Sequence, residues 1–214
     1  MAHRVPRLMR WQAGWALRKR VAPRKTEAVL RSADDKYVAP PHLAQTSAGV
    51  LNLEMGAYLL ALRDALVEIG VEGENVNELL AESLYRVMKR FYGPIDALAI
   101  VVHPMSRLAR SRWRQALSRR FFFRPPDWQM VEVTATRGHG FDVRRCVMAE
   151  YMSGRGEQRF CQEVICKQDL LMAQARAEVL MRTLTIAAGD DRCDFRFAPF
   201  RERGGTGLAV QPEP

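Results

Sequence analysis

The first half of the chain carries its apolar residues at the spacing of helices. Three helices are expected, over residues 48–70, 75–93 and 95–121. The first stops at a glycine, the second opens on an Asn-x-x-Glu capping box and is expected to end at a Gly-Pro pair, and the third stops before two adjacent prolines. This half of the chain is therefore predicted to be helical throughout.

A basic segment precedes these helices. Leu8, Trp11 and Trp15 recur at i, i+3 and i+7 among arginines, which predicts one basic amphipathic helix over 1–31 that a proline interrupts or ends. Such a helix can dock on the rest of the protein, pair with a second subunit in a homo-oligomer, or lie on an anionic membrane surface, and we favour docking or pairing. Residues 32–47 have few periodic apolar positions and two adjacent prolines, as is typical of a linker.

In the second half the period changes to the alternation of β-strands. The expected elements are strands over 128–136 and 141–147 joined by the turn "RGHG", helices over 148–154 and 157–176, and a β-hairpin formed by 179–187 and 193–200. The predicted fold class is α+β, in which N-terminal helices precede a small antiparallel sheet with helices packed on one face. We expect a basic N-terminal helix and linker at 1–47, a single α+β domain at 48–203 and a disordered tail at 204–214.

Charge and composition indicate which partners and which cellular location to expect. The net charge is +9, and residues 107–124 hold seven arginines and no acid. We expect no nucleic acid as partner, because no recognised reader motif is present and few aromatic residues interleave with the basic runs. No apolar run approaches the ~20 residues that span a bilayer, and the first residues lack the apolar core of a secretory signal. Four cysteines without paired spacing fit a reducing compartment, so a cytoplasmic location is predicted.

Polar side chains that could carry chemistry occur on both strands that are expected to be central. Alternation along 141–147 places Asp142, Arg144 and Cys146 on one strand face, close in sequence to His139 in the preceding turn. In the last strand, alternation places Cys193, Phe195 and Phe197 on the apolar side and Asp194 and Arg196 together on the other.

A helix supplies the third polar cluster. Cys166 and Asp169 are three residues apart, so they share one helix face. A thiolate is a strong nucleophile and a carboxylate can act as acid or base, but a free cysteine is also among the most frequently buried residues. Four thiolates could hold an iron–sulfur cluster or zinc; without any C-x-x-C spacing, we expect no metal or cofactor. The usual motifs of phosphate binding, zinc proteolysis and serine hydrolysis are absent from the sequence.

Taken together, "FDVRRCVMAEYMSGRGEQRFCQEVICKQDLLM" and "RTLTIAAGDDRCDFRF" resemble the L-2-amino-thiazoline-4-carboxylic acid hydrolase family over residues 125–200. The positions that carry the resemblance are Cys146, Cys166, Asp169, Gly189, Asp190, Cys193, Asp194, Phe195 and Arg196. Cys161 matches no position of the family pattern. The closing Gly-Asp-x-x-Cys pattern also resembles 4-vinyl reductase-type small-ligand domains, which implies a shared sheet fold.

The resemblance implies a hydrolase that opens a C–N bond of a small heterocyclic or amidine-like substrate with water. We expect Cys146 or Cys166 to be the nucleophile and Asp169 or Asp194 the acid–base partner. Arg144, Arg196 and His139 are expected to bind the substrate, and Cys193 to be structural or to line the site. The alternatives are a non-hydrolytic domain in which the same cysteines bind a small ligand, a metal or an iron–sulfur cluster, and a scaffold that binds a partner or membrane.

Overall fold

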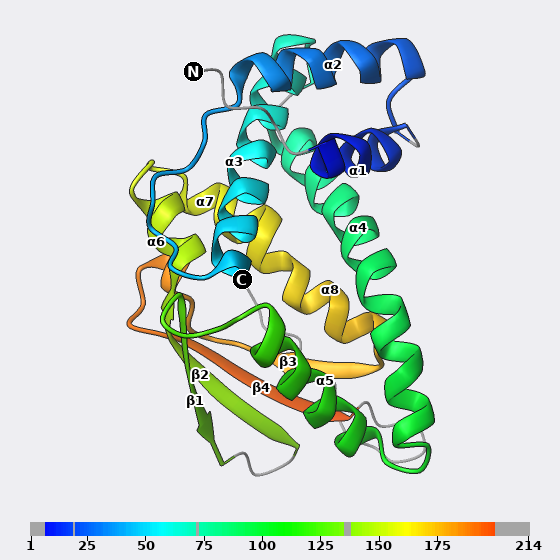
Figure 1. Ribbon diagram of the computed structural model, residues 1–214, viewed down its shortest axis with the longest axis vertical. Helices are drawn as coiled ribbons and strands as arrows, with labels where there is room; N and C mark the ends of the chain where they lie inside the picture. The colour runs from blue at the N-terminus through cyan, green and yellow to red at the C-terminus, as the bar shows by residue number, and fades with distance from the viewer. Residues whose placement is uncertain (1–6, 19, 72, 135–137, 200–214) are drawn as a thin grey trace.

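The computed structural model describes residues 7–18, 20–71, 73–134 and 138–199 (Figure 1). Its first half is helical: α1 (Arg7–Leu17), α2 (Pro23–Lys36), α3 (Ser47–Glu68), α4 (Gly73–Val102) and α5 (Arg107–Phe121). The predicted disordered tail, 204–214, lies outside the described residues.

The second half builds a sheet and the helices that follow its first two strands. The elements are β1 (Trp128–Val133), β2 (His139–Cys146), α6 (Val147–Ser153), α7 (Gln158–Phe160), a π-helical turn (Cys161–Cys166), α8 (Lys167–Ala175), β3 (Glu178–Met181), a 3₁₀ turn (Ile186–Ala188) and β4 (Cys193–Pro199). The four strands are antiparallel, in the order β1-β2-β4-β3. This arrangement confirms the predicted α+β class.

One side of the sheet, here called the inner face, is apolar and covered by helices. It carries Phe141, Val143, Cys193, Phe195 and Phe197, whose exposed fractions are at most 8%. Helices α5 and α8 lie against the sheet, α4 packs against both of them, and α3 packs against α4 and α6 (Figure 1). The strand residues alternate between this core and the opposite side, here called the outer face, so the alternation predicted for β4 is confirmed.

The N-terminal segment forms two helices and not the single one expected over 1–31. Pro23 is the first residue of α2, a position that tolerates proline because its missing N–H would be unpaired there anyway. Leu17 of α1 and Val29 of α2 are fully buried in the same core cluster as the aromatic residues of the sheet. The expected linker is correspondingly shorter, because α2 continues to Lys36.

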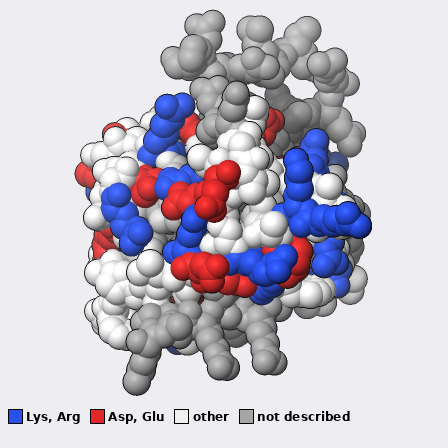
Figure 2. Space-filling model, turned by 90° about the horizontal axis from the view of Figure 1, so that it is seen from above, with Lys and Arg blue, Asp and Glu red and all other residues white. Residues whose placement is uncertain are grey.

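Much of the basic charge at this end of the molecule is paired with acids. Arg10 of α1 contacts Glu27 at 2.7 Å and Asp34 at 2.8 Å, both on α2. Lys36 contacts Glu68 of α3 at 3.2 Å. Seen from above, basic and acidic side chains are interspersed over the described surface (Figure 2).

Helix α4 is longer than its sequence pattern indicates. It was expected to end at Gly93-Pro94, but it continues through Pro94 to Val102. Proline removes one backbone hydrogen bond from a helix, and packing can compensate for that loss. Tyr92 and Ala99, on either side of Pro94, are 6% and 0% exposed, so both halves of α4 are anchored in the interior.

Asp127, just before β1, fastens the connection between α2 and α3 to the sheet. Its carboxylate accepts hydrogen bonds from the backbone amides of Gln45 and Thr46, both at 2.8 Å. The Thr46 hydroxyl donates a hydrogen bond to Asp127 and accepts one from the backbone amide of Gly49 at 3.0 Å, so it caps the start of α3. Burial raises the pKa of Asp127, but these hydrogen bonds outweigh it and hold the pKa below its ordinary value.

Strand β3 is shorter than expected, because side chains take the amides that a longer strand would have paired. The predicted strand 179–187 ends at Met181. The Asp194 carboxylate accepts hydrogen bonds from the backbone amides of Thr183, at 2.8 Å, and Leu184, at 2.6 Å. The Asp190 carboxylate accepts one from the amide of Thr185 at 2.7 Å. The chain therefore forms an ordered loop between β3 and β4. Among the described helices, none is long and apolar enough to cross a membrane.

Candidate active site

The helix expected over 157–176 is interrupted by a π-helical turn at Cys161–Cys166. A π-helical turn is rare and occurs frequently at functional sites. Its i→i+5 period places the first and last residues of this turn on one side, and the two sulfur atoms lie 3.9 Å apart. Cys161 is buried and Cys166 half-buried. The turn therefore brings a second thiol, which the family pattern did not include, against Cys166.

Asp169, three residues after Cys166, forms an ion pair with Arg182, a residue that was not predicted from the sequence. Nη1 of Arg182 donates to Oδ2 of Asp169 at 2.7 Å, and Nη2 donates to the carbonyl oxygen of Cys166 at 3.2 Å. The guanidinium also lies over the ring of Phe195, 5.3 Å from its centroid. Arg182 follows β3 directly, and it reaches this place because the chain turns back after α8 so that β3 packs against that helix.

The Asp169 carboxylate is set within the protein but still reaches solvent. Burial raises its pKa above the ordinary value of an aspartate, and the neighbouring Arg182 partly opposes that shift. The Asp169 side chain is nevertheless 41% exposed, whereas that of Arg182 is 9% exposed. A carboxylate with a raised pKa that solvent can reach is suited to exchange protons with a bound molecule.

A β-bulge turns Cys146 toward this pair. Gln129 is opposite Arg145 and Met130 is opposite Val143, so Arg144 is an extra residue in β2. The expectation that Cys146 shares a face with Asp142 and Arg144 is wrong for this reason: the extra residue shifts the alternation by one. Cys146 instead lies opposite Trp128 and packs against the core.

Three thiols that approach the inner face are all shifted toward their neutral form. Burial raises the pKa of Cys146 to about 12 and that of Cys193 to about 11. Contact with the Cys161 thiol, and then burial, raise the pKa of Cys166 well above its usual range. Cys166 and Cys193 both contribute to the raised pKa of Cys146, and Cys166 also contributes to that of Cys193, so these three thiols form one cluster. At neutral pH these groups are thiols and not thiolates.

Stacked rings continue the inner face beyond the thiols. Phe141 and Phe195 stack with their centroids 5.0 Å apart, and His139 stacks on Phe197 at 5.1 Å. His139 was expected in a turn but belongs to β2, where its Nε2 lies 2.6 Å from the Ser111 hydroxyl of α5. Burial is the main cause that lowers the pKa of His139, so its ring is neutral at pH 7.

Comparison with known proteins adds a finding to this geometry. The protein-family model described as L-2-amino-thiazoline-4-carboxylic acid hydrolase matches residues 74–197, which is more than half of the chain. The chain belongs to this family. No curated protein and no solved structure matches it. The family match runs from α4 to β4, so it reaches further toward the N-terminus than the resemblance over 125–200.

The closing pattern that carried the family resemblance builds the loop before β4. Gly189 has a φ of 102°, a left-handed conformation that favours glycine. Asp190 and Asp194 accept the loop amides described above, and Cys193 accepts the amide of Ile186 at 3.3 Å. Burial raises the pKa of Asp194, but the hydrogen bonds from Leu184 and Thr183 outweigh it and hold the pKa below its ordinary value.

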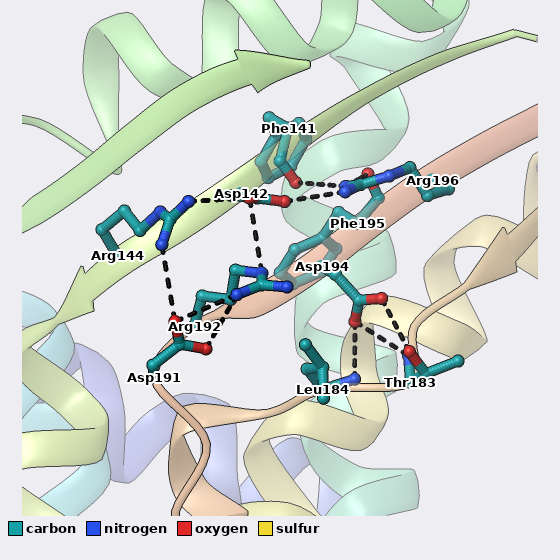
Figure 3. A network of polar contacts seen from close by, with 10 residues as sticks. All are labelled: Phe141, Asp142, Arg144, Thr183, Leu184, Asp191, Arg192, Asp194, Phe195 and Arg196. Atoms are coloured by element: carbon teal, nitrogen blue, oxygen red, sulfur yellow. Dashed lines mark hydrogen bonds and ion pairs between the residues drawn. The ribbon is translucent and has the colours of Figure 1, made fainter. Parts of the chain in front are cut away.

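The two arginines that were expected to bind the substrate, Arg144 and Arg196, lie on the outer face (Figure 3). Asp142 is buried there between Arg196, at 2.9 Å, and Arg144, at 3.3 Å. Arg192 joins the network through Asp191 at 3.0 Å and Asp142 at 3.5 Å. Arg144 and Arg196 therefore lie across the sheet from the thiols. Within the described residues, no group of three or more His, Cys, Asp and Glu side chains has an arrangement that could hold a metal ion.

Proposed function

We propose that this member of the thiazoline hydrolase family opens a C–N bond of a small heterocyclic or amidine-like substrate at the inner face. The observation that carries the proposal is the Asp169–Arg182 pair beside Cys166, with 41% of the Asp169 side chain exposed next to neutral thiols. Family membership supports C–N bond hydrolysis, and the geometry supports a carboxylate as the group that activates water.

In the proposed reaction, Asp169 takes a proton from a water molecule whose oxygen bonds to the amidine-like carbon. The protonated Asp169 gives this proton to the amidine nitrogen, and it then carries the remaining hydroxyl proton to the same nitrogen as the C=O bond forms and the C–N bond breaks. Both water protons end on the leaving amine, the carboxylate is regenerated and one water is consumed. A raised pKa favours this double role, because the group must first accept and then release the proton. Arg182 fixes the orientation of Asp169 through its hydrogen bond.

The thiol of Cys166 has a supporting role in this proposal. Since its pKa is raised, it is a neutral hydrogen-bond donor to the bound substrate and not a resting nucleophile. Arg144 and Arg196 are on the outer face, so we do not place them at the same substrate.

The experiment is turnover of L-2-amino-thiazoline-4-carboxylate as the test substrate, with the ring-opened product measured by mass spectrometry. Asp169→Asn should lower kcat by about 10²–10⁴-fold, the usual loss for a general acid–base group. Asp191→Asn is the matched control, because Asp191 is an outer-face carboxylate that is 64% exposed. Unchanged kcat in Asp169→Asn would overturn the assignment. Detection of a covalent substrate adduct on Cys166 would show that this thiol, and not water, attacks the substrate, and would also overturn the proposed reaction.

A further inference from the structure

A groove outside the thiol cluster lies between the C-terminal end of α5 and strand β1. Its volume is about 660 Å³, which is within the range of small-molecule sites. The residues that line it are Ala116, Arg119, Arg120, Phe121, Phe123, Arg124, Pro125, Trp128, Met130 and Glu132. Trp128, which lies opposite Cys146 in the β1–β2 pair, lines this groove, whereas none of the four cysteines does.

The groove has more positive charge than its own acids neutralise. Arg119 pairs with Glu132 at 2.6 Å. Arg120 and Arg124 are exposed, and neither has a carboxylate partner among the residues that the structure describes. Favourable interaction with the end of the α5 dipole accounts for a cation at Arg120, but Arg124 lies beyond the end of that helix. Two free guanidinium groups at one groove are therefore available to an anion.

The rest of the groove wall is apolar and aromatic. Phe123 and Trp128 meet edge to face, with centroids 5.3 Å apart, and Phe121 is 54% exposed. Aromatic walls favour a flat apolar body, and guanidinium groups bind carboxylates with paired hydrogen bonds. We propose that this groove binds an organic anion that joins an aromatic or other flat apolar body to a carboxylate, independently of the hydrolytic site.

Isothermal titration calorimetry of the full chain with three probes tests the proposal. The probes are 2-naphthoate, its uncharged analogue 2-naphthamide, and acetate, which has the charge without the ring. Naphthoate should bind one-to-one with a Kd below about 1 mM, and at least about tenfold more tightly than either other probe. No binding of naphthoate, or equal binding of the neutral amide, would overturn the proposal.

Paired variants locate the site. The double variant Arg120→Gln/Arg124→Gln should weaken naphthoate binding at least about tenfold, because it removes both free cations. Arg112→Gln is the control, since Arg112 is exposed on α5 but does not line the groove. Equal affinities in the double variant and the wild type would show that naphthoate binds elsewhere and would overturn the assignment. The measurement uses no turnover, so its outcome is separate from that of the hydrolase proposal.

Discussion

Replacement of Arg182 by methionine should shift the pH dependence of hydrolysis in a known direction. Arg182 opposes the effect of burial on Asp169, so its removal leaves burial alone and raises the pKa of Asp169 further. The proposed base acts only as a carboxylate. The acidic limb of the kcat/KM profile should therefore move to higher pH in Arg182→Met.

The structure sets the size of this shift. The guanidinium Nη1 lies 2.7 Å from Oδ2 of Asp169, and the Arg182 side chain is 9% exposed, but the Asp169 side chain is 41% exposed, so solvent screens the pair in part. An arginine in such contact typically lowers a carboxyl pKa by about 1–3 units, and partial screening by solvent favours the lower end of this range, about 1 unit. Well below the limb, kcat/KM should fall by about tenfold, whereas above it the rate should largely recover.

The assay is kcat/KM for ring opening between pH 4 and 9, with thermal unfolding recorded for each variant. Arg182→Lys keeps the positive charge and should show a smaller displacement, although lysine loses the paired geometry and the contact over Phe195. Arg192→Met is the matched control, because Arg192 pairs with acids on the outer face. An unmoved limb in Arg182→Met, or an equal shift in Arg192→Met, would refute the reasoning.

Three further outcomes are expected. Burial raises the pKa of Cys146 to about 12 and that of Cys193 to about 11. Iodoacetamide at pH 7 should therefore modify the cysteines of the native chain at least about tenfold more slowly than those of the chain unfolded in urea. A native cysteine that reacts as fast as in urea would contradict this expectation. Asp127→Ala should lower the free energy of unfolding in urea by about 2–4 kcal/mol, as two amides lose their acceptor. Because the pKa of Asp127 is lowered, this stabilisation is present above about pH 4 and is lost as the pH falls through the folded-state pKa; a constant difference between variant and wild type would be inconsistent. In Gly49→Ala, the new Cβ would overlap the Asp127 carboxylate and would also meet the Cβ of Ala44, so this variant should unfold at a lower urea concentration than the wild type.

The sequence predicted the fold where local patterns and packing agree. The helical period over 48–70 became α3, and strand alternation placed Phe195 and Phe197 on the inner face. Prediction was wrong where a tertiary contact overrides the local signal. Pro94 does not end α4 because residues on both sides of it are buried, and β3 ends early because Asp194 takes its amides.

The candidate site was only partly predictable, and its irregular elements are the reason. Helical spacing correctly joined Cys166 to Asp169 as neighbours on one helix. Arg182 could not be found from spacing, because its contact with Asp169 crosses from the end of β3 to α8. Nothing in the local pattern signals the π-helical turn either, since the same residues also fit a regular α-helix.

Two irregularities, one in a helix and one in a strand, act on the same group of thiols. The π-helical turn brings Cys161 against Cys166, and the extra residue at Arg144 turns Cys146 from the outer face to the inner one. Both features interrupt the regular pattern of backbone hydrogen bonds, and both occur frequently near functional sites. A core that needed only small apolar side chains would gain nothing from either, because regular elements place such residues equally well. Their convergence beside Asp169 and Arg182 therefore supports the inner face, and not the outer arginine network, as the place of the chemistry.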